Sequence, residues 1–245
     1  MKWVKEIFAR IWALWALVSF LVTMIIFLVP LLLGCLTVKD PLATHRFIAM
    51  ARIWMAVWLR LIGCPLTVRG KEHFSAGKPY IVICNHNALM DVPVSSPAIP
   101  GGNKTIAKAE MAKIPLFGII YKLGSVLVDR KNDRSRKESF LQMKKVLESG
   151  LHMCIYPEGT RNKTSEPLKG FHDGAFRLAL DTKTSIIPGV IFHTRLVNPA
   201  DKVFYLLPHR LRIDFLEPIT PLATDTVESL KTRSWNTMEE HILKG

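Results

Sequence analysis

The sequence lacks the motifs that mark several common classes of protein. It has no Walker loop for nucleotide phosphates, no G-x-S-x-G turn that would expose a nucleophilic serine, and no cluster of residues with zinc-ligand spacing. It also has no zinc-finger, RRM or basic-zipper pattern, no internal repeat and no low-complexity segment. These absences disfavour a serine hydrolase and a nucleic-acid-binding protein, and no metal site is predicted.

Cysteine is scarce, and its spacing carries no redox or metal signature. The chain has four cysteines, and no two of them form a C-x-x-C pair. They are Cys35, Cys64, Cys84 and Cys154. Each lies among apolar neighbours, which is typical of a buried, reduced thiol. The sequence therefore favours a reducing compartment.

Acidic residues are outnumbered by basic ones. The 33 Lys and Arg residues against 20 Asp and Glu residues give a net charge of +13, with no long basic run. This balance suits an anionic membrane surface, an anionic substrate or an acidic carrier protein, and nucleic acid is a weaker alternative. With 245 residues, 49% of them hydrophobic, the chain can hold one sizeable domain and an appendage.

Residues 11–38 contain no Asp, Glu, Lys or Arg. As a helix this segment would be about 42 Å long, which exceeds the ~30 Å hydrocarbon core of a bilayer. Candidate interfacial anchors lie near its start, at Trp3, Arg10, Trp12 and Trp15. Pro30 and Gly34 predict an interruption, as a kink or a re-entrant turn, at its far end. A cleaved signal peptide is the alternative, but the apolar stretch is too long for one.

Residues 45–63 have apolar side chains at three- and four-residue spacing, which predicts a second helix. Arg46, Arg52 and Arg60 argue against a membrane span. We expect this helix to lie in the membrane interface with its arginines toward lipid phosphates, and packing on the core of the domain is the open alternative. The chain is thus divided into membrane-associated helices at 1–65 and a second domain at 66–245.

From residue 66 onward, short β-like runs alternate with helical segments. The expected strands are Leu66–Arg69, Tyr80–Cys84, Thr105–Ala107, Ser125–Val128, Met153–Tyr156, Ile186–Ile191 and Arg212–Leu216. The expected helices cover about 92–99, 115–123, 133–149, 172–182 and 225–243. This alternation predicts an α/β fold with a mostly parallel central sheet flanked by helices, preceded by the two membrane-associated helices.

An imidazole and a carboxylate follow the second expected strand. The apolar run Tyr80–Cys84 ends in Asn85, so His86 is placed just past the carboxyl end of a buried strand, where α/β sheets hold ligands. A neutral imidazole is a suitable base for a hydroxyl, and Asp91 is close enough to orient it. The alternative is a helix-capping arrangement without chemistry.

An anion-binding sequence follows the strand at 153–156. Pro157 stops that strand, and residues 158–161 (Glu-Gly-Thr-Arg) form the loop after it. Gly159 permits close backbone approach to a ligand, and Arg161 offers a planar fork that matches phosphate. The alternative is a surface turn with a solvated ion pair.

Four groups of residues in this order carry a family resemblance. They are Asn85-His86 with Asp91, Lys108-Ala109-Glu110 with Pro115-Leu116-Phe117-Gly118, the run from Tyr156 to Arg161, and Ile187-Pro188-Gly189-Val190. Over about 80–217, and with the apolar segment ahead of it, the chain resembles the 1-acylglycerol-3-phosphate acyltransferases, the lysophosphatidate acyltransferases of glycerolipid synthesis. Asn87 and Ala88 stand where members often have glutamine and serine, and Gly189 is also less usual.

The resemblance implies a role for each matching residue. His86 would be the general base toward the free glycerol hydroxyl, with Asp91 as its orienting partner. Lys108 and Arg161 would bind the acceptor phosphate. The pocket would be shaped by Glu158, Gly159 and Thr160, and an acyl-side wall would include Pro188. Asn85 and Arg130 are further candidates for the site. The acyl group would pass directly from coenzyme A or acyl carrier protein, without a cofactor or an acyl-enzyme.

The implied partners are a lysophospholipid acceptor, an acyl thioester and an anionic membrane surface. The implied location is membrane-associated, with the catalytic domain on the cytoplasmic side of a bacterial inner membrane or its equivalent. Charges flank the apolar segment on both sides, so its orientation is not predicted from them. Two alternatives stay open: transfer to a lyso-aminolipid or to glycerol 3-phosphate, and a non-catalytic, basic lipid-binding protein.

Overall fold

The computed structural model describes residues 2–129 and 131–245, so the candidate Arg130 lies outside the described residues. The helices are α1 (Lys2–Leu36), α2 (Leu42–Leu61), α3 (Asp91–Ala98), α4 (Phe117–Gly124), α5 (Asp133–Glu148), α6 (Gly174–Thr182), α7 (Thr194–Val197) and α8 (Val227–Lys244). There are also two 3-10 helices in the described residues, η1 (Lys71–His73) and η2 (Ala109–Lys113). The strands are β1 (Leu66–Arg69), β2 (Ile81–Cys84), β3 (Asn103–Lys108), β4 (Ser125–Val128), β5 (His152–Ile155), β6 (Ile186–Phe192) and β7 (Leu211–Phe215).

The strands form one sheet in the order β1-β7-β6-β2-β5-β3-β4. Every neighbouring pair is parallel except β6 and β7, so β1 and β7 run against the other five. β2 is central, between β6 and β5, and all four of its residues are buried. The carboxyl ends of β6, β2, β5, β3 and β4 therefore share one edge of the sheet, and the loops that follow them are neighbours.

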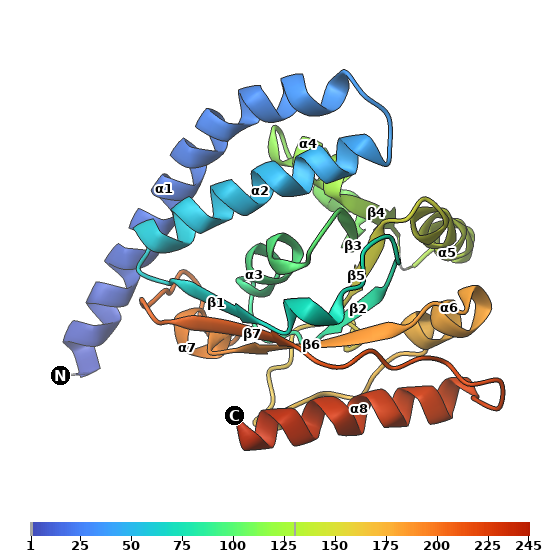
Figure 1. Cartoon of the computed structure of the whole chain (residues 1–245). Helices are drawn as coiled ribbons and strands as arrows, with labels where there is room; N and C mark the ends of the chain where they lie inside the picture. Colours follow the sequence, from blue (N-terminus) through green and yellow to red (C-terminus); the bar gives the residue numbers. More distant parts are fainter. Residues whose placement is uncertain (1, 130) are drawn as a thin grey trace.

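Helices cover both faces of this sheet (Figure 1). On one face α2, α3 and part of α4 pack on a core that includes Val82, Val94 and Ile187. On the other face α5, α6 and α8 enclose a second core around Ile83 and Phe176. The alternation of side chains along each strand supplies both cores, as expected for a sheet buried on two sides.

α1 and α2 form an antiparallel helical hairpin (Figure 1). Indole groups fasten the two helices together: Trp54 donates to Thr23 Oγ1 at 2.9 Å, and Trp58 donates to the Ala16 carbonyl at 3.1 Å. Trp12 donates to the carbonyl of Ile62 at 2.9 Å. These bonds account for Trp12, Trp54 and Trp58, since an indole N–H in an apolar contact needs an acceptor.

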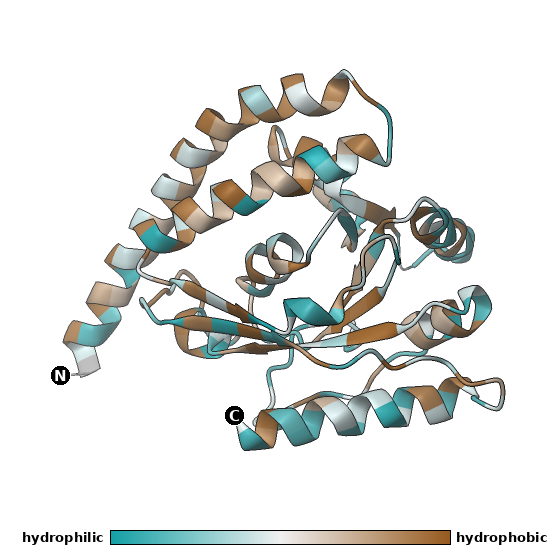
Figure 2. Cartoon of the chain, viewed as in Figure 1, coloured by the Kyte–Doolittle hydropathy of each residue, from teal (hydrophilic) through white to brown (hydrophobic). Residues whose placement is uncertain are grey.

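The outer face of α1 is apolar and uncovered (Figure 2). Residues 3–36 have a mean hydropathy of 2.8 and form a helix long and apolar enough to cross a membrane. Trp3, Ile7, Ile26 and Leu33 are each more than half exposed. A continuous apolar surface of this size on a monomer marks an interaction with a membrane or another apolar partner. The apolar helix therefore indicates membrane association.

The helix α1 continues through Pro30 and Gly34 to Leu36, so the predicted re-entrant turn is wrong, whereas the alternative, a kink within the helix, stays a prediction. Pro30 lacks only one N–H donor, and burial of Met24 and Leu31 against α2 holds the helix on both sides of it. The other helices and all seven strands lie where the sequence predicted them, within three residues at each end for the segments after residue 66. The short elements η1, η2 and α7 were not predicted.

α2 packs on the core of the domain rather than lying free in a membrane interface. Phe47, Trp54 and Trp58 are buried in it. Arg52, which we expected to face lipid phosphates, donates instead to the carbonyls of Pro97 and Ile99 at the end of α3, each at 2.9 Å. The orphan carbonyls of a helix end attract such a cation, which explains the difference. All four cysteines are buried free thiols, as predicted.

Candidate active site

Two loops meet at the carboxyl edge of the sheet. The base loop, residues 85–91, follows β2, and the anion loop, residues 157–170, follows β5. The two strands are parallel neighbours, with Ile83 paired to Ile155. Because the pairing brings residues beyond 84 and 155 side by side, motifs some 70 positions apart in the sequence become one site.

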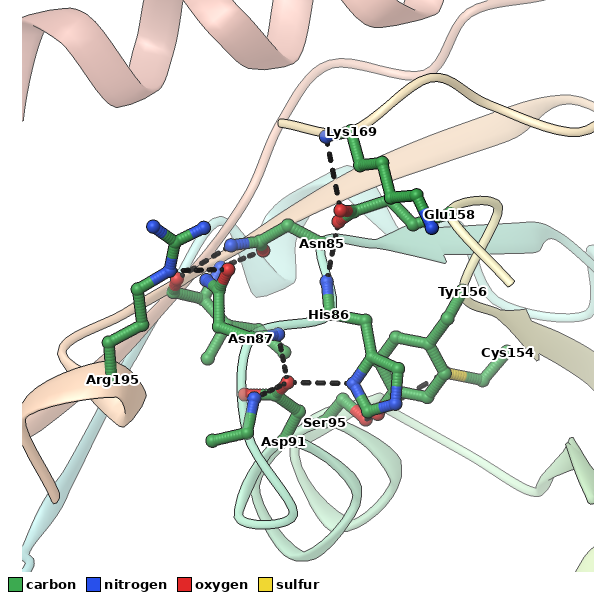
Figure 3. Close-up of polar contacts among 12 residues, drawn as sticks. Asn85, His86, Asn87, Asp91, Ser95, Cys154, Tyr156, Glu158, Lys169 and Arg195 are labelled. Carbon is green, nitrogen blue, oxygen red and sulfur yellow. Dashed lines mark hydrogen bonds and ion pairs between the residues drawn. The ribbon is translucent and has the colours of Figure 1, made fainter. Parts of the chain in front are cut away.

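His86 and Asp91 form a hydrogen-bonded pair (Figure 3). His86 Nδ1 lies 2.8 Å from Asp91 Oδ2. The same oxygen accepts the backbone N–H groups of Asn87 at 2.5 Å and Ala88 at 2.7 Å. A carboxylate bonded in this way requires the proton on Nδ1, so the lone pair of the neutral imidazole is on Nε2. The side chain of His86 is 19% exposed, whereas that of Asp91 is fully buried.

The position of Asp91 follows from helix geometry. It is the first residue of α3, and the loop before the helix bends so that the carboxylate accepts the backbone N–H groups of Asn87 and Ala88. The positive end of the helix dipole also favours a carboxylate here. Within the described residues, Asp91 Oδ1 has no hydrogen-bond partner, so the carboxylate is held through one oxygen.

Glu158 joins the base loop to the anion loop. Its Oε1 accepts the backbone N–H of His86 at 2.7 Å, and its Oε2 accepts that of Lys169 at 3.1 Å. Burial raises the pKa of the Glu158 carboxyl to about 6, and the two backbone hydrogen bonds oppose this rise. Glu158 therefore positions the backbone of His86 rather than offering its carboxylate to solvent.

A second bond between the loops involves the other polar group of the same residue. The backbone N–H of Asn162 donates to the carbonyl of His86 at 2.6 Å. Both backbone polar groups of His86 are thus held by the anion loop. Arg161 directly precedes Asn162, so the guanidinium side chain that is predicted to bind phosphate begins next to the backbone of His86.

Asn85 continues the pairing of β2 with β6. Its side-chain amide donates to the carbonyl of Ile191 at 3.0 Å and accepts the N–H of Ile191 at 2.7 Å. These two bonds take the place of backbone pairing with β6 beyond the end of β2. Both Asn85 and Ile191 are buried, where a polar group needs a hydrogen-bond partner.

Tyr156 lies directly under the imidazole (Figure 3). The rings of His86 and Tyr156 have centroids 4.5 Å apart and planes inclined by 31°. The phenol oxygen lies 2.6 Å from Ser95 Oγ. Burial raises the pKa of Tyr156 well above its ordinary value, so the phenol stays protonated. The ring fixes the plane of the imidazole, and Ser95 fixes the ring.

The predicted phosphate ligands surround the same edge. Lys108 ends β3 and is exposed, and Arg161 is half-buried in the anion loop. No ion pair or side-chain hydrogen bond holds either side chain among residues 2–129 and 131–245. Gly159 has a φ of +69°, which a side chain would strain. Thr160 accepts a bond from Lys169 Nζ at 2.8 Å.

Pro188 is not brought to this loop cluster. It lies inside β6, paired with Ile83, and is buried. Ile186 and Val190, two positions to either side, belong to the core against α6 and α8. Alternation places Pro188 on that same face of the sheet, opposite the face on which α3 packs. Its role in an acyl-side wall stays a prediction.

Three residues of this site were not predicted from the sequence. Tyr156 and Lys169 have the positions described above, and Arg195 from α7 contacts Asn87. Tyr156 could have been found from the sequence, because it directly follows β5, the strand adjacent to the one before His86. Arg195 had none. In the described part of the chain, no group of three or more His, Cys, Asp or Glu side chains is placed to hold a metal ion.

Comparison with known proteins identifies the family. The sequence model of the family described as Acyltransferase matches residues 65–192, which include every site residue predicted from the sequence. The chain belongs to the acyltransferase family. The match covers both loops of the site, and the resemblance drawn from the sequence is confirmed.

Several curated relatives are named 1-acyl-sn-glycerol-3-phosphate acyltransferase. A protein from Cocos nucifera is 34% identical over 67% of this chain and 52% of its own. One from Saccharomyces cerevisiae is 34% identical over 63% of this chain and 52% of its own. The chain thus spans about half the length of the curated relatives it matches.

A solved structure supports the fold. The crystal structure of the 1-acyl-sn-glycerophosphate (LPA) acyltransferase, PlsC, from Thermotoga maritima aligns with a TM-score of 0.81 and 19% identity. The alignment covers 100% of this chain and 97% of the other. The predicted fold class, an α/β fold with a mostly parallel sheet and an apolar N-terminal helix, is therefore confirmed.

Proposed function

We propose that this protein transfers an acyl group from an acyl thioester to the free sn-2 hydroxyl of 1-acylglycerol 3-phosphate, giving phosphatidic acid. The observation that carries the proposal is the pair of His86 and Asp91, bonded at 2.8 Å and tied by its backbone to the anion loop. The names of the family relatives support the acceptor. The thioester would be that of coenzyme A or acyl carrier protein, and no separate cofactor takes part.

The geometry suits direct transfer. Nε2 of His86 takes the proton of the acceptor hydroxyl while the oxygen attacks the thioester carbonyl. Asp91 holds the resulting imidazolium through Nδ1. When the tetrahedral intermediate collapses, the C–S bond breaks and the thiolate leaves, taking the proton back from His86. The thiolate is a good leaving group, so the reaction needs a positioned base rather than a nucleophilic side chain.

The anion loop supplies the acceptor's phosphate site in this proposal. Arg161 binds phosphate through its planar fork, and Lys108 adds a positive charge from the neighbouring strand. Gly159 lets the backbone approach the ligand, and Glu158 and Thr160 keep the loop in shape. A negatively charged group gains most where basic side chains are not already paired, which is the case for Arg161 and Lys108 among the described residues.

The apolar face of α1 supports membrane association, from which a lysolipid acceptor would enter the site. The hairpin is fixed to the domain by the bonds of Arg52 to the end of α3 and by packing of α2 on the core, so the catalytic edge keeps one orientation to the bilayer. We place the catalytic domain on the cytoplasmic side, where acyl thioesters are available. Protease accessibility in sealed, oriented vesicles tests that side.

Acyl transfer by the purified protein tests the function. Wild-type protein, with labelled acyl-CoA or acyl carrier protein, should acylate lysophosphatidate in preference to a lyso-aminolipid and glycerol 3-phosphate. His86→Ala should reduce turnover at least about 10³-fold, as expected when a general base is lost. The control is His172→Ala, because that ring is exposed and has no described side-chain bond. Turnover by His86→Ala at the wild-type rate would overturn the mechanism.

The phosphate site is tested separately. Arg161→Ala should raise the acceptor KM about tenfold or more while kcat changes less, because it removes binding made equally to substrate and transition state. An unchanged KM would remove Arg161 from the phosphate site. Preferred transfer to another acceptor would redefine the substrate without removing the base. Lipid binding without transfer to any acceptor would indicate a non-catalytic protein.

A further inference from the structure

Arg195 spreads its guanidinium over three acceptors at the edge of the site. Its Nε donates to Asn87 Oδ1 at 2.9 Å (Figure 3). Its Nη1 donates to the carbonyl of Thr164 at 2.9 Å, and its Nη2 donates to the carbonyl of Glu166 at 3.1 Å. Asn87 belongs to the base loop, and the two carbonyls belong to the anion loop. One side chain from α7, after β6, therefore binds both.

Asn162, which is buried, bonds to the same two residues of the anion loop, Thr164 and Glu166. Its Nδ2 donates to the carbonyl of Glu166 at 3.0 Å, and its Oδ1 accepts the N–H of Thr164 at 2.9 Å and the Thr164 hydroxyl at 2.7 Å. Its own N–H donates to the carbonyl of His86. Asn162 is 1% exposed. The turn held by Arg195 is thus the turn that reaches the backbone of the base.

The guanidinium of Arg195 is occupied by protein rather than offered to a ligand. All three of its nitrogens donate to the acceptors named above. Arg161 contrasts with it, because no described residue pairs with that side chain. A phosphate competing for Arg195 would have to break bonds that hold both loops. Arg195 is therefore suited to fixing geometry, and Arg161 is suited to binding the anion.

Asn87 links Arg195 to the pair formed by His86 and Asp91. Its side-chain oxygen accepts from Arg195, and its backbone N–H donates to the oxygen of Asp91 that also holds His86. The chain has asparagine at this position, and its short amide sets how closely Arg195 approaches the base loop. Movement of either loop would change the separation between the imidazole and Arg161.

We propose that Arg195 is a positioning residue that fixes the spacing between the His86 imidazole and the anion loop, and thereby selects which acceptor hydroxyl meets the base. This inference rests on the proposed function. In the acceptor, three bonds of glycerol separate the phosphate oxygen from the hydroxyl. While the anion loop holds the phosphate, the hydroxyl can meet the base only at one spacing between the imidazole and that loop. A misplacement of about 1 Å costs as much as 10²-fold in rate.

Amide hydrogen exchange, which needs no substrate, is the first test. The variants are Arg195→Met, Arg195→Lys, Asn87→Ala and the double variant Asn87→Ala/Arg195→Met. The control is Arg177→Met, which removes an exposed arginine of α6 without a described side-chain partner. Arg195→Met should accelerate exchange about tenfold or more in peptides covering 85–91 and 158–169 and leave those from α5 and α8 unchanged. Unchanged exchange in both loops would overturn the inference.

Kinetics with lysophosphatidate is the second test. Arg195→Met should lower kcat about 10- to 100-fold, with acceptor KM within about threefold, because Arg161 still binds the phosphate. Arg195→Lys should recover only part of kcat, since an ammonium cannot reach all three acceptors. The double variant should lose little more than Arg195→Met alone, as expected for residues acting through one contact.

The preference among acceptors is the third test, because a general loss of folding would not change it. Arg195→Met should lower the preference for lysophosphatidate over glycerol 3-phosphate, while its melting temperature stays close to that of Arg177→Met. A parallel fall of activity on all acceptors, matched by a fall in melting temperature, would overturn the positioning role. A wild-type protein that acylates no acceptor would overturn the proposed function instead, whatever the exchange data show.

Discussion

Replacing Asp91 by asparagine separates the charge of this residue from its role at the start of α3. The amide oxygen of Asn can take the place of Oδ2 and still accept from Asn87, Ala88 and His86 Nδ1. The base loop should therefore keep its shape. What disappears is the negative charge 2.8 Å from the imidazole, which in the proposed mechanism stabilises the imidazolium formed during proton transfer.

The size of the effect follows from that distance and from burial. Two unit charges about 4 Å apart interact by about 4 kcal/mol at the effective dielectric constant of a partly exposed site. Loss of most of this stabilisation corresponds to a fall of about 10²- to 10³-fold in kcat. The new amide nitrogen occupies the position of Oδ1, which has no described partner in the wild-type protein either, so the exchange breaks no described bond of that atom.

The assay follows release of the free thiol from acyl-CoA with lysophosphatidate in detergent micelles, for Asp91→Asn, His86→Ala and the double variant. Asp91→Asn should lower kcat, leave the acceptor KM within about threefold, and add nothing in the His86→Ala background. Wild-type kcat in Asp91→Asn would refute the reasoning. So would a further large loss in the double variant, because Asp91 would then act without the imidazole.

Two further predictions concern stability. Burial raises the pKa of Glu158 from 4.5 to about 6, so the fold is stabilised by this group below about pH 4.5 and loses that contribution, about 2 kcal/mol, as the pH rises through about 6. Urea unfolding between pH 4 and 7 should show the decline, and Glu158→Gln should flatten its slope; an unchanged slope would contradict the assignment. Trp54→Phe removes the indole bond to Thr23 and should destabilise the hairpin by about 1–2 kcal/mol without lowering kcat, measured by thermal melting and the thiol assay.

The strands could be predicted from the sequence because their burial leaves a strong local pattern. Residues 81–84, 152–155 and 186–192 are buried at every position, so each appears as a short apolar run ended by a polar residue or proline. Strand order leaves no comparable trace. The antiparallel pairing of β6 with β7 depends on a connection that runs through α7, which is too short to show periodicity.

The periodicity of the hairpin's second helix could not predict what that helix packs against. Residues 45–63 have one apolar stripe whether that stripe faces lipid or the domain. The distinction lies in Arg52, whose bonds to Pro97 and Ile99 cross 45 and 47 positions of sequence. No local pattern predicts an arginine at a helix end so far away. The division of the chain at residue 65 likewise stays a prediction, since α2 packs on the core of the second part.

The site divides in the same way. His86, Asp91 and the anion loop could be found because each lies within a few residues of a strand end, and neighbouring parallel strands must bring such ends together. Tyr156 and Arg195 act across the sheet, by ring packing on His86 and by bonds to Asn87 and to the anion loop. The segments that follow β2, β5 and β6 are therefore joined by direct contacts between their residues. A substitution in any one of them should therefore alter the position of His86, and under the role proposed for Arg195 it should also alter the preference among acceptors.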